Sequence, residues 1–175
     1  YRPQNINYIL LYMEKDLKKY NNIIIKRISN NSRSKEIKTE KINKEVIILK
    51  VQKRCNKHRY FQEKKIYLRL KDEDILPKLR YFDDKHLILG LTDVGTSFEI
   101  YKNVNPKKYN KSLEVYNKEI KNIIDILYDK YGLYHNDLHL KNICIDNNNK
   151  IRLIDFDACS NKLKNRKYLI LKPKN

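Results

Sequence analysis

The stretch from residue 134 to residue 159 reads YHNDLHLKNICIDNNNKIRLIDFDAC, and no other part of the chain says more about the fold. Its side chains that offer oxygen atoms include Asp137, Asn142 and Asp155. Short β-branched runs on either side of a polar turn at Asp146–Lys150 predict a hairpin between Asn142 and Asp155. The sequence therefore predicts a loop that carries a carboxylate, then a hairpin, then a second carboxylate.

This order resembles the catalytic loop and the metal-binding aspartate of the protein-kinase superfamily. In such enzymes one carboxylate lies beside the acceptor hydroxyl, while an amide and a second carboxylate meet at the metal ions that bridge the phosphates. The resemblance implies that Asp137 positions the acceptor and takes its proton, and that Asn142 and Asp155 are metal ligands. ATP and Mg²⁺ are the expected cofactors, because Mg²⁺ prefers hard oxygen ligands together with phosphate oxygens.

Two upstream residues match the same superfamily in the expected order. Lys50 ends the apolar run EVIILK, which predicts a buried strand over Glu45–Gln52. Glu63 lies within the apolar stripe of a helix expected over Lys57–Leu70, and a buried carboxylate there should be paired with a cation. The resemblance implies that Lys50 holds the α- and β-phosphates, that Glu63 orients Lys50, and that both act with Asp137 in catalysis.

The chain after residue 77 predicts two more strands, over Lys78–Phe82 and Leu87–Leu91. By the same resemblance, Leu89 is the gatekeeper residue, and the backbone from Gly90 to Thr92 contacts adenine. The nucleotide-binding set implied by the resemblance is Lys50, Leu89, Gly90, Leu91, Asn142 and Asp155.

The fold class that follows is α+β, in the form of a bilobal protein-kinase-like fold. Residues 1–91 are expected to form a small lobe with an antiparallel sheet, and residues 92–175 the catalytic core of a truncated helical large lobe. The segment after Asp157 is too short for the remaining helices of an ordinary large lobe. Those helices are therefore absent or lie outside this chain.

Local patterns add four expectations. Apolar residues at helical spacing predict a helix over residues 7–20 and a long helix from Ser112, as N-cap, to Lys130. A β-branched run predicts a strand over Asn22–Ile28. Residues 92–110 contain several Asn, Gly and Pro residues, which predict turns with little regular structure.

Four departures from the kinase pattern qualify the resemblance. The turn that should be rich in glycine reads SNNSRS over Ser29–Ser34, and a loop without glycine approaches phosphates less easily. Asn136 stands where an arginine is usual, His139 where a lysine is usual, and Asp157 where a glycine is usual. His139 and Asp157 make the pattern more similar to lipopolysaccharide-sugar kinases, aminoglycoside phosphotransferases and RIO-type atypical kinases. Asp157 itself can be read as a metal ligand, a helix cap or a solvated charge.

Composition sets broad limits on partners and compartment. The chain has a formal net charge of +18, but its basic residues are scattered and no nucleic-acid-binding motif is present, so nucleic acid is not the favoured partner. Its three cysteines are widely spaced, which argues against a zinc site or a disulfide framework and favours an intracellular, cytoplasmic setting. No apolar run is long enough to span a membrane.

The sequence therefore predicts an ATP- and Mg²⁺-dependent phosphotransferase that acts on a hydroxyl of a protein or a small molecule. A Ser/Thr protein kinase of atypical type is the first interpretation. A small-molecule or sugar kinase is the second, because of His139 and Asp157. The third is a truncated kinase mimic, or pseudokinase, that serves as a binding module and has lost turnover.

Overall fold

The computed structural model describes residues 36–42, 45–164 and 171–173. The helix expected at residues 7–20, the strand at 22–28 and the glycine-free turn at 29–34 lie outside the described residues.

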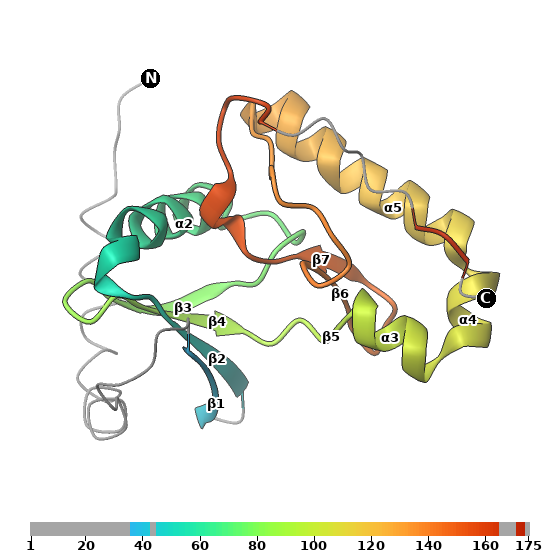
Figure 1. Ribbon diagram of the computed structural model, residues 1–175, viewed down its shortest axis with the longest axis horizontal. Helices are drawn as coiled ribbons and strands as arrows, with labels where there is room; N and C mark the ends of the chain where they lie inside the picture. Colours follow the sequence, from blue (N-terminus) through green and yellow to red (C-terminus); the bar gives the residue numbers. More distant parts are fainter. Residues whose placement is uncertain (1–35, 43–44, 165–170, 174–175) are drawn as a thin grey trace.

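A four-stranded antiparallel sheet forms the first half of the described chain, in the order β1-β2-β4-β3 (Figure 1). Its strands are β1 (Glu36–Ile42), β2 (Glu45–Val51), β3 (Leu79–Asp83) and β4 (Ile88–Thr92), and the last three match the sequence expectation to within two residues. Lys50 on β2 is the register partner of Leu89 on β4. Partners in an antiparallel pair face the same side of a sheet, so these two side chains share one face.

One long helix, α2 (Lys57–Arg69), lies beside this sheet (Figure 1). It follows a single 3₁₀ turn at Arg54–Asn56. Its buried residues are Tyr60, Glu63, Ile66 and Tyr67. Glu63 therefore sits within an apolar stripe that faces the core, as the helical spacing predicts.

The predicted hairpin is present as β6 (Ile143–Ile145) and β7 (Ile151–Leu153). The Asp146 carboxylate closes its turn by accepting hydrogen bonds from the N–H groups of Asn148 and Lys150, at 2.8 and 2.9 Å. A short strand, β5 (Thr96–Ser97), pairs with β6 and completes a three-stranded sheet.

The approach of β5 to the hairpin depends on Gly95, which has φ of 95°. A Cβ atom there would lie 2.2 Å from the backbone oxygen of Ile145, so a side chain cannot be accommodated without moving the backbone.

The expectation of turns over residues 92–110 is wrong for most of that range. The segment contains two short helices, α3 (Phe98–Val104) and α4 (Pro106–Lys111). Pro106 lies at the start of α4, where its missing N–H costs nothing. Buried rings hold the two helices against the next one, with Phe98 in edge-to-face contact with Tyr101, Tyr109 and Tyr116. Aromatic packing therefore stabilises helical structure in this region. The residues that usually break helices, Asn105 and Pro106, only separate α3 from α4.

The long helix predicted from Ser112 to Lys130 is present as α5 (Leu113–Asp125), followed directly by a π-helical turn at Ile126–Lys130. Ser112 occupies the N-cap position, but its side chain caps no backbone N–H among the described residues. Gly132, with φ of 60°, follows the last turn. The exit from this helix leads into the loop that carries Asp137.

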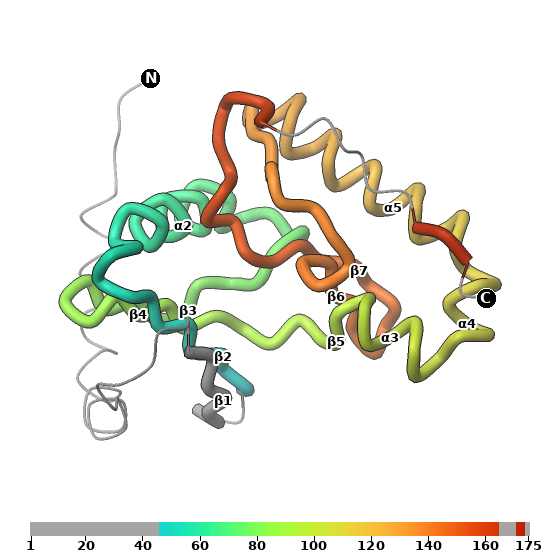
Figure 2. Tube along the Cα trace, in the orientation of Figure 1, coloured from blue at the N-terminus to red at the C-terminus, as the bar shows by residue number. Residues whose placement is uncertain are grey.

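The larger apolar core is continuous across these elements. It joins residues of β4 and α2, including Leu89 and Tyr67, with residues of β6, β7 and α5, including Leu153 and Ile120. The tube in Figure 2 shows the segment after Asp155 rising between α2 and α5. The division into two lobes at residue 91 stays a prediction, since this core runs through both halves.

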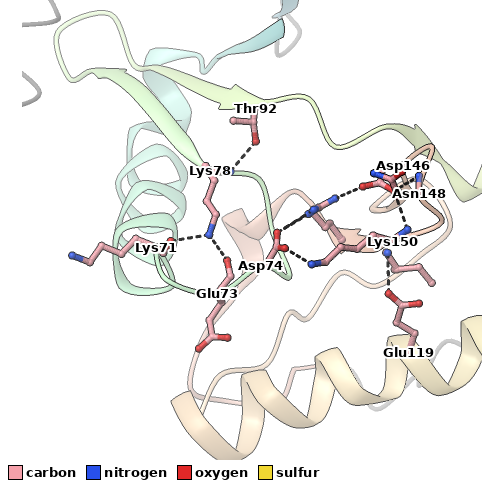
Figure 3. A network of polar contacts seen from close by, with 11 residues as sticks. Lys71, Glu73, Asp74, Lys78, Thr92, Glu119, Asp146, Asn148 and Lys150 are labelled. Carbon is pink, nitrogen blue, oxygen red and sulfur yellow. Dashed lines mark hydrogen bonds and ion pairs between the residues drawn. The ribbon is translucent and has the colours of Figure 1, made fainter. Parts of the chain in front are cut away.

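A polar network fastens the loop before β3 to the β6–β7 hairpin (Figure 3). Asp74 accepts hydrogen bonds from Arg152, at 3.0 and 3.1 Å, and is also ion-paired with Lys150. Arg152 in turn donates to Asp146 at 2.8 Å. The backbone N–H of Leu153 donates to the carbonyl of Ile75 at 2.9 Å in the same region. These contacts fix β7, and therefore the position from which Asp155 leaves the hairpin.

Candidate active site

Lys50 is the centre of a buried cluster of charges. Its Nζ donates to both carboxylate oxygens of Glu63 and, at 2.7 Å, to Oδ1 of Asp155. Lys50 is 6% exposed and Glu63 is 0% exposed, so water does little to screen their attraction. The predicted ion pair between Lys50 and Glu63 is confirmed.

The charge on Lys50 is maintained by its neighbours. Burial alone would lower the pKa of Lys50, because it removes water from the ammonium group, but the nearby carboxylates of Glu63 and Asp155 outweigh this and raise the pKa above its usual value. One ammonium group between two carboxylates gives the cluster a net negative charge. It can therefore accept a further cation beside a group that attracts phosphate.

The loop before β6 holds a second pair, Asp137 and Asn142. The side-chain amide of Asn142 donates to the backbone carbonyl of Asp137 at 3.0 Å and to its Oδ2 at 3.2 Å. Asn142 is 5% exposed, whereas Asp137 is exposed. The amide nitrogen is directed at Asp137, so the amide oxygen is the atom that a metal ion would use.

A backbone hydrogen bond connects the Asp137–Asn142 pair to the charged cluster that contains Asp155. The carbonyl of Asn142 accepts a hydrogen bond from the N–H of Ile154 at 3.0 Å, directly before Asp155. Asn142 precedes β6 and Asp155 follows β7, so the hairpin brings both to the same end. The shared role of Asp137, Asn142 and Asp155 in metal binding stays a prediction.

His135 contacts the backbone beside the hydrogen bond between Ile154 and Asn142. Its Nε2 lies 2.9 Å from the carbonyl of Ile154, and its ring lies 4.8 Å from that of Phe156. Burial lowers the pKa of His135, although the carbonyl of Ile154 opposes this shift. The ring is therefore neutral at pH 7, and a proton on Nε2 lets it donate to Ile154.

Asp155 has an uncommon backbone conformation. Its φ of 67° and ψ of 61° place it in the left-handed region, which aspartate tolerates better than most residues other than glycine. Phe156, which follows, is fully buried against Tyr67 of α2 at a ring distance of 5.7 Å. Anchoring Phe156 in the core turns the chain at Asp155, so that its carboxylate reaches Lys50.

The sequence was also compared with known protein families. The family model described as the Haspin-like kinase domain matches residues 10–171. The chain belongs to the Haspin-like kinase domain family. A search of curated proteins finds no match. The membership confirms the expected protein-kinase-like family, and the helices and antiparallel sheets fit the expected α+β class. The finer resemblance to RIO-type kinases, sugar kinases and aminoglycoside phosphotransferases stays a prediction.

The predicted adenine contacts of this Haspin-like kinase domain lie in β4. Leu89 is fully buried on the face that also carries Lys50. Gly90 faces the other way, where a Cβ atom would lie 2.9 Å from Cβ of Tyr81. Strands β2 and β3 flank β4 on both sides, so the ladder occupies the backbone groups of Gly90 and Leu91. The N–H groups of Thr92 and Asp93 are engaged as well, by the carbonyls of Lys78 and Val46 at 3.0 and 3.1 Å. The adenine contacts themselves stay a prediction.

Two polar contacts between α2 and the chain after Asp155 were not foreseen from the sequence. Arg59 lies 3.6 Å from Asp157, whose side chain is 8% exposed, and Gln62 donates to the carbonyl of Cys159 at 2.6 Å. An ion pair with α2 was not among the three readings of Asp157. The partners are almost a hundred residues apart, and no local pattern announces such a pair.

The residues of this kinase domain fit Mg²⁺ better than a metal held by protein alone. The described residues contain no group of three or more His, Cys, Asp or Glu side chains placed to hold a metal ion. Mg²⁺ keeps water and phosphate oxygens and needs only one or two protein ligands, which an amide and a carboxylate can supply.

No helix in the described part of the chain is long and apolar enough to cross a membrane.

Proposed function

We propose that this Haspin-like kinase domain transfers the terminal phosphate of ATP, with Mg²⁺, to a serine or threonine hydroxyl of a protein, as an atypical Ser/Thr kinase. The observation that carries the proposal is the buried cluster of Lys50, Glu63 and Asp155. A buried ammonium group held by a fully buried carboxylate is costly to maintain, and its use is to present a fixed positive charge to phosphate. Membership in a kinase family supports the same reading.

Each residue has a distinct part in the proposed reaction. Lys50 binds the α- and β-phosphates, and Glu63 keeps its Nζ in place. Asp155 and the amide oxygen of Asn142 would hold Mg²⁺, which would neutralise charge on the phosphates. Asp137 orients the acceptor hydroxyl and takes its proton as the oxygen bonds to phosphorus and ADP leaves. The hydrogen bonds from Asn142 to Asp137 keep that carboxylate in register with the metal ligands.

A radiolabelled-ATP transfer assay tests the proposal. The chain is incubated with ATP and a panel of protein, peptide and small-molecule acceptors, with Mg²⁺ or with EDTA. Nucleotide binding is measured in parallel by thermal shift. We expect Mg²⁺-dependent binding of ATP and labelling of a protein hydroxyl, both reduced in Lys50→Met.

The other outcomes point to the alternative functions. Labelling only of sugars or other small molecules would replace the protein acceptor with a small-molecule one. Binding of no nucleotide with any divalent ion would rule out the enzyme and favour a kinase mimic that acts as a binding module.

A further inference from the structure

The side chain of Asn136 binds one short segment, residues 158–164, at four points. Its Nδ2 lies within hydrogen-bond distance of three oxygen atoms, namely the carbonyl of Ala158 at 3.2 Å, Oγ of Ser160 at 3.0 Å and the carbonyl of Lys162 at 3.1 Å. Its Oδ1 accepts a hydrogen bond from the N–H of Lys164 at 2.9 Å. One amide group therefore gathers the whole segment around it.

These partners determine which way the amide of Asn136 points. Oxygen atoms surround its NH₂ group and an N–H group faces its oxygen, so the reversed amide would set oxygen against oxygen. The hydroxyl of Ser160 donates its own proton to the carbonyl of Lys162 at 2.9 Å, and its lone pairs remain for Asn136. Both ends of the amide are thus used by the same segment.

The backbone around Asn136 is shaped for this contact. Tyr134 exchanges two backbone hydrogen bonds with Ser160, at 2.8 and 3.0 Å, and Asn136 then has φ of 63°. Asparagine adopts this left-handed region more readily than most residues. It also combines a donor and an acceptor in one planar group, whereas glycine has neither, aspartate lacks the donor and arginine lacks the acceptor.

Burial does little to hold the end of this segment. Cys159 is buried in the apolar core, but every residue over 161–164 is exposed. The carbonyl of Lys162 and the N–H of Lys164 are nevertheless both held by Asn136. The hydrogen bonds to Asn136 therefore place a stretch that the core does not reach.

We propose that Asn136 is a positioning residue, which fastens residues 158–164 to the catalytic loop and thereby fixes the backbone from which Asp137 projects. The inference rests on the proposed function, because Asp137 is the group that takes the acceptor proton. Asp137 is then held from two sides, by the anchored backbone of Asn136 and by the amide of Asn142. A small displacement of such a group lowers the rate strongly, because transfer requires close alignment of the reacting atoms.

The nucleotide side of the site should not depend on Asn136. Lys50 is fixed separately, by its ion pairs with Glu63 and Asp155. A loss at Asn136 should therefore lower kcat and leave the KM for ATP nearly unchanged. A general loss of stability would instead affect ATP binding and turnover together.

Hydrogen exchange tests the attachment without turnover. The full chain is compared as wild type and as Asn136→Gly, which keeps the left-handed backbone and removes the amide. Mass spectrometry follows the amides of residues 158–164, with those of α5 as the internal reference. We expect exchange over 158–164 to become at least about tenfold faster in Asn136→Gly, with no change in α5. Wild-type protection of this segment in the variant would overturn the proposal.

The matched control is Asn149→Gly. Asn149 has φ of 62° in the turn of the β6–β7 hairpin, so this variant makes the same chemical change at the same kind of backbone. It should leave exchange over residues 158–164 as in wild type. Equal acceleration in both variants would show that the effect is not specific to Asn136 and would overturn the proposal.

Kinetics test the effect on Asp137. Transfer from radiolabelled ATP to myelin basic protein and to casein is measured, together with hydrolysis of ATP without an acceptor. We expect kcat to fall by about 10- to 100-fold in Asn136→Gly and in Asn136→Arg, with the KM for ATP within about twofold of wild type. Asn136→Arg introduces the residue that is usual in the superfamily, but a guanidinium group cannot accept the N–H of Lys164. Wild-type kcat in either variant would overturn the proposal.

Two further outcomes separate this inference from the proposed function. Faster exchange over residues 158–164 in Asn136→Gly, with no transfer or hydrolysis by wild type, would reject the phosphotransfer and the catalytic role of Asn136, while the attachment itself would stand. Equal losses of kcat and of ATP binding, with a lower urea midpoint, would make Asn136 a general stabilising residue and overturn its positioning role.

Discussion

Lys50 and Asp137 are both placed for phosphate chemistry, but the molecule holds them in contrasting ways. Lys50 is buried between two carboxylates, so its position is set by charges that water cannot replace. Asp137 is exposed, and it is positioned by two hydrogen bonds from the buried amide of Asn142. A change in the first group should cost stability as well as activity, whereas a change at Asp137 should cost activity alone.

The largest expected effect is on the rate of phosphate transfer when the exposed residue, Asp137, is changed. Asp137→Asn should reduce phosphate transfer by about 10²- to 10⁴-fold, because the amide cannot take a proton from the acceptor. Its free energy of unfolding should change by less than about 0.5 kcal/mol, since the side chain is exposed. The measurements are transfer rates and urea unfolding on the same samples. A large loss of stability would erase the contrast with Lys50.

On the buried side, Glu63→Ala should lower the free energy of unfolding by about 3 kcal/mol, because it leaves the buried ammonium of Lys50 with one carboxylate fewer. The isosteric Glu63→Gln keeps the shape, and it separates the lost charge from the lost packing. Urea unfolding measures both variants. A cost below about 1 kcal/mol for the alanine variant would show that Asp155 alone is enough to hold Lys50.

The free energy of unfolding should depend on pH through His135, which packs between the catalytic loop and Asp155. Its pKa is lowered in the folded protein by burial, so the unfolded chain binds the proton more readily. Stability is then fully present above the unfolded pKa of about 6.5, and it falls as the pH drops below that value, by at most about 1.4 kcal/mol per pH unit.

The measurement is urea unfolding of wild type and His135→Gln at pH values from 7.5 down to 5.0. The variant should be less stable at neutral pH, but its stability should fall less between pH 6.5 and pH 5.5. Parallel curves for the two proteins would refute the assignment of this pH dependence to His135.

The smallest expected effect concerns the network that fixes β7. Asp74→Asn should cost about 1 kcal/mol, because Asp74 meets both Arg152 and Lys150 and Arg152 is largely buried. Asp125→Asn, which breaks the exposed pair with Lys121 on α5, is the matched control and should cost no more than about 0.5 kcal/mol. Unfolding midpoints measure both, and equal costs would mean that the network adds nothing beyond one surface pair.

The parts that sequence reasoning found are those with a strong local pattern. Glu63 stood out as a carboxylate within an apolar helical stripe, and the strand that ends at Lys50 was equally clear, although the pairing of the two residues came from the kinase resemblance. The β6–β7 hairpin followed from alternating β-branched residues around a polar turn. In each case the residues that define the element are close together in the sequence, so propensity and spacing are sufficient.

The parts that it missed depend on contacts over long distances. Over residues 92–110, Asn105 and Pro106 suggested irregular structure, yet rings from α3, α4 and α5 pack into one cluster that stabilises both short helices. The pair between Arg59 and Asp157 joins two segments that only the complete fold brings together. The π-helical turn at Ile126–Lys130 likewise has no pattern that separates it from an ordinary helical turn.

The left-handed backbone of Asp155 has a consequence for the evolution of such chains. Aspartate, asparagine and glycine adopt this conformation at low cost, while branched residues do so poorly. Selection for a well-folded domain would therefore retain one of these three residues at position 155 even in a lineage that no longer transfers phosphate. Drift after loss of catalysis should appear earlier at Asp137, where neither backbone strain nor burial restrains substitution, and that position is the better marker of an active descendant.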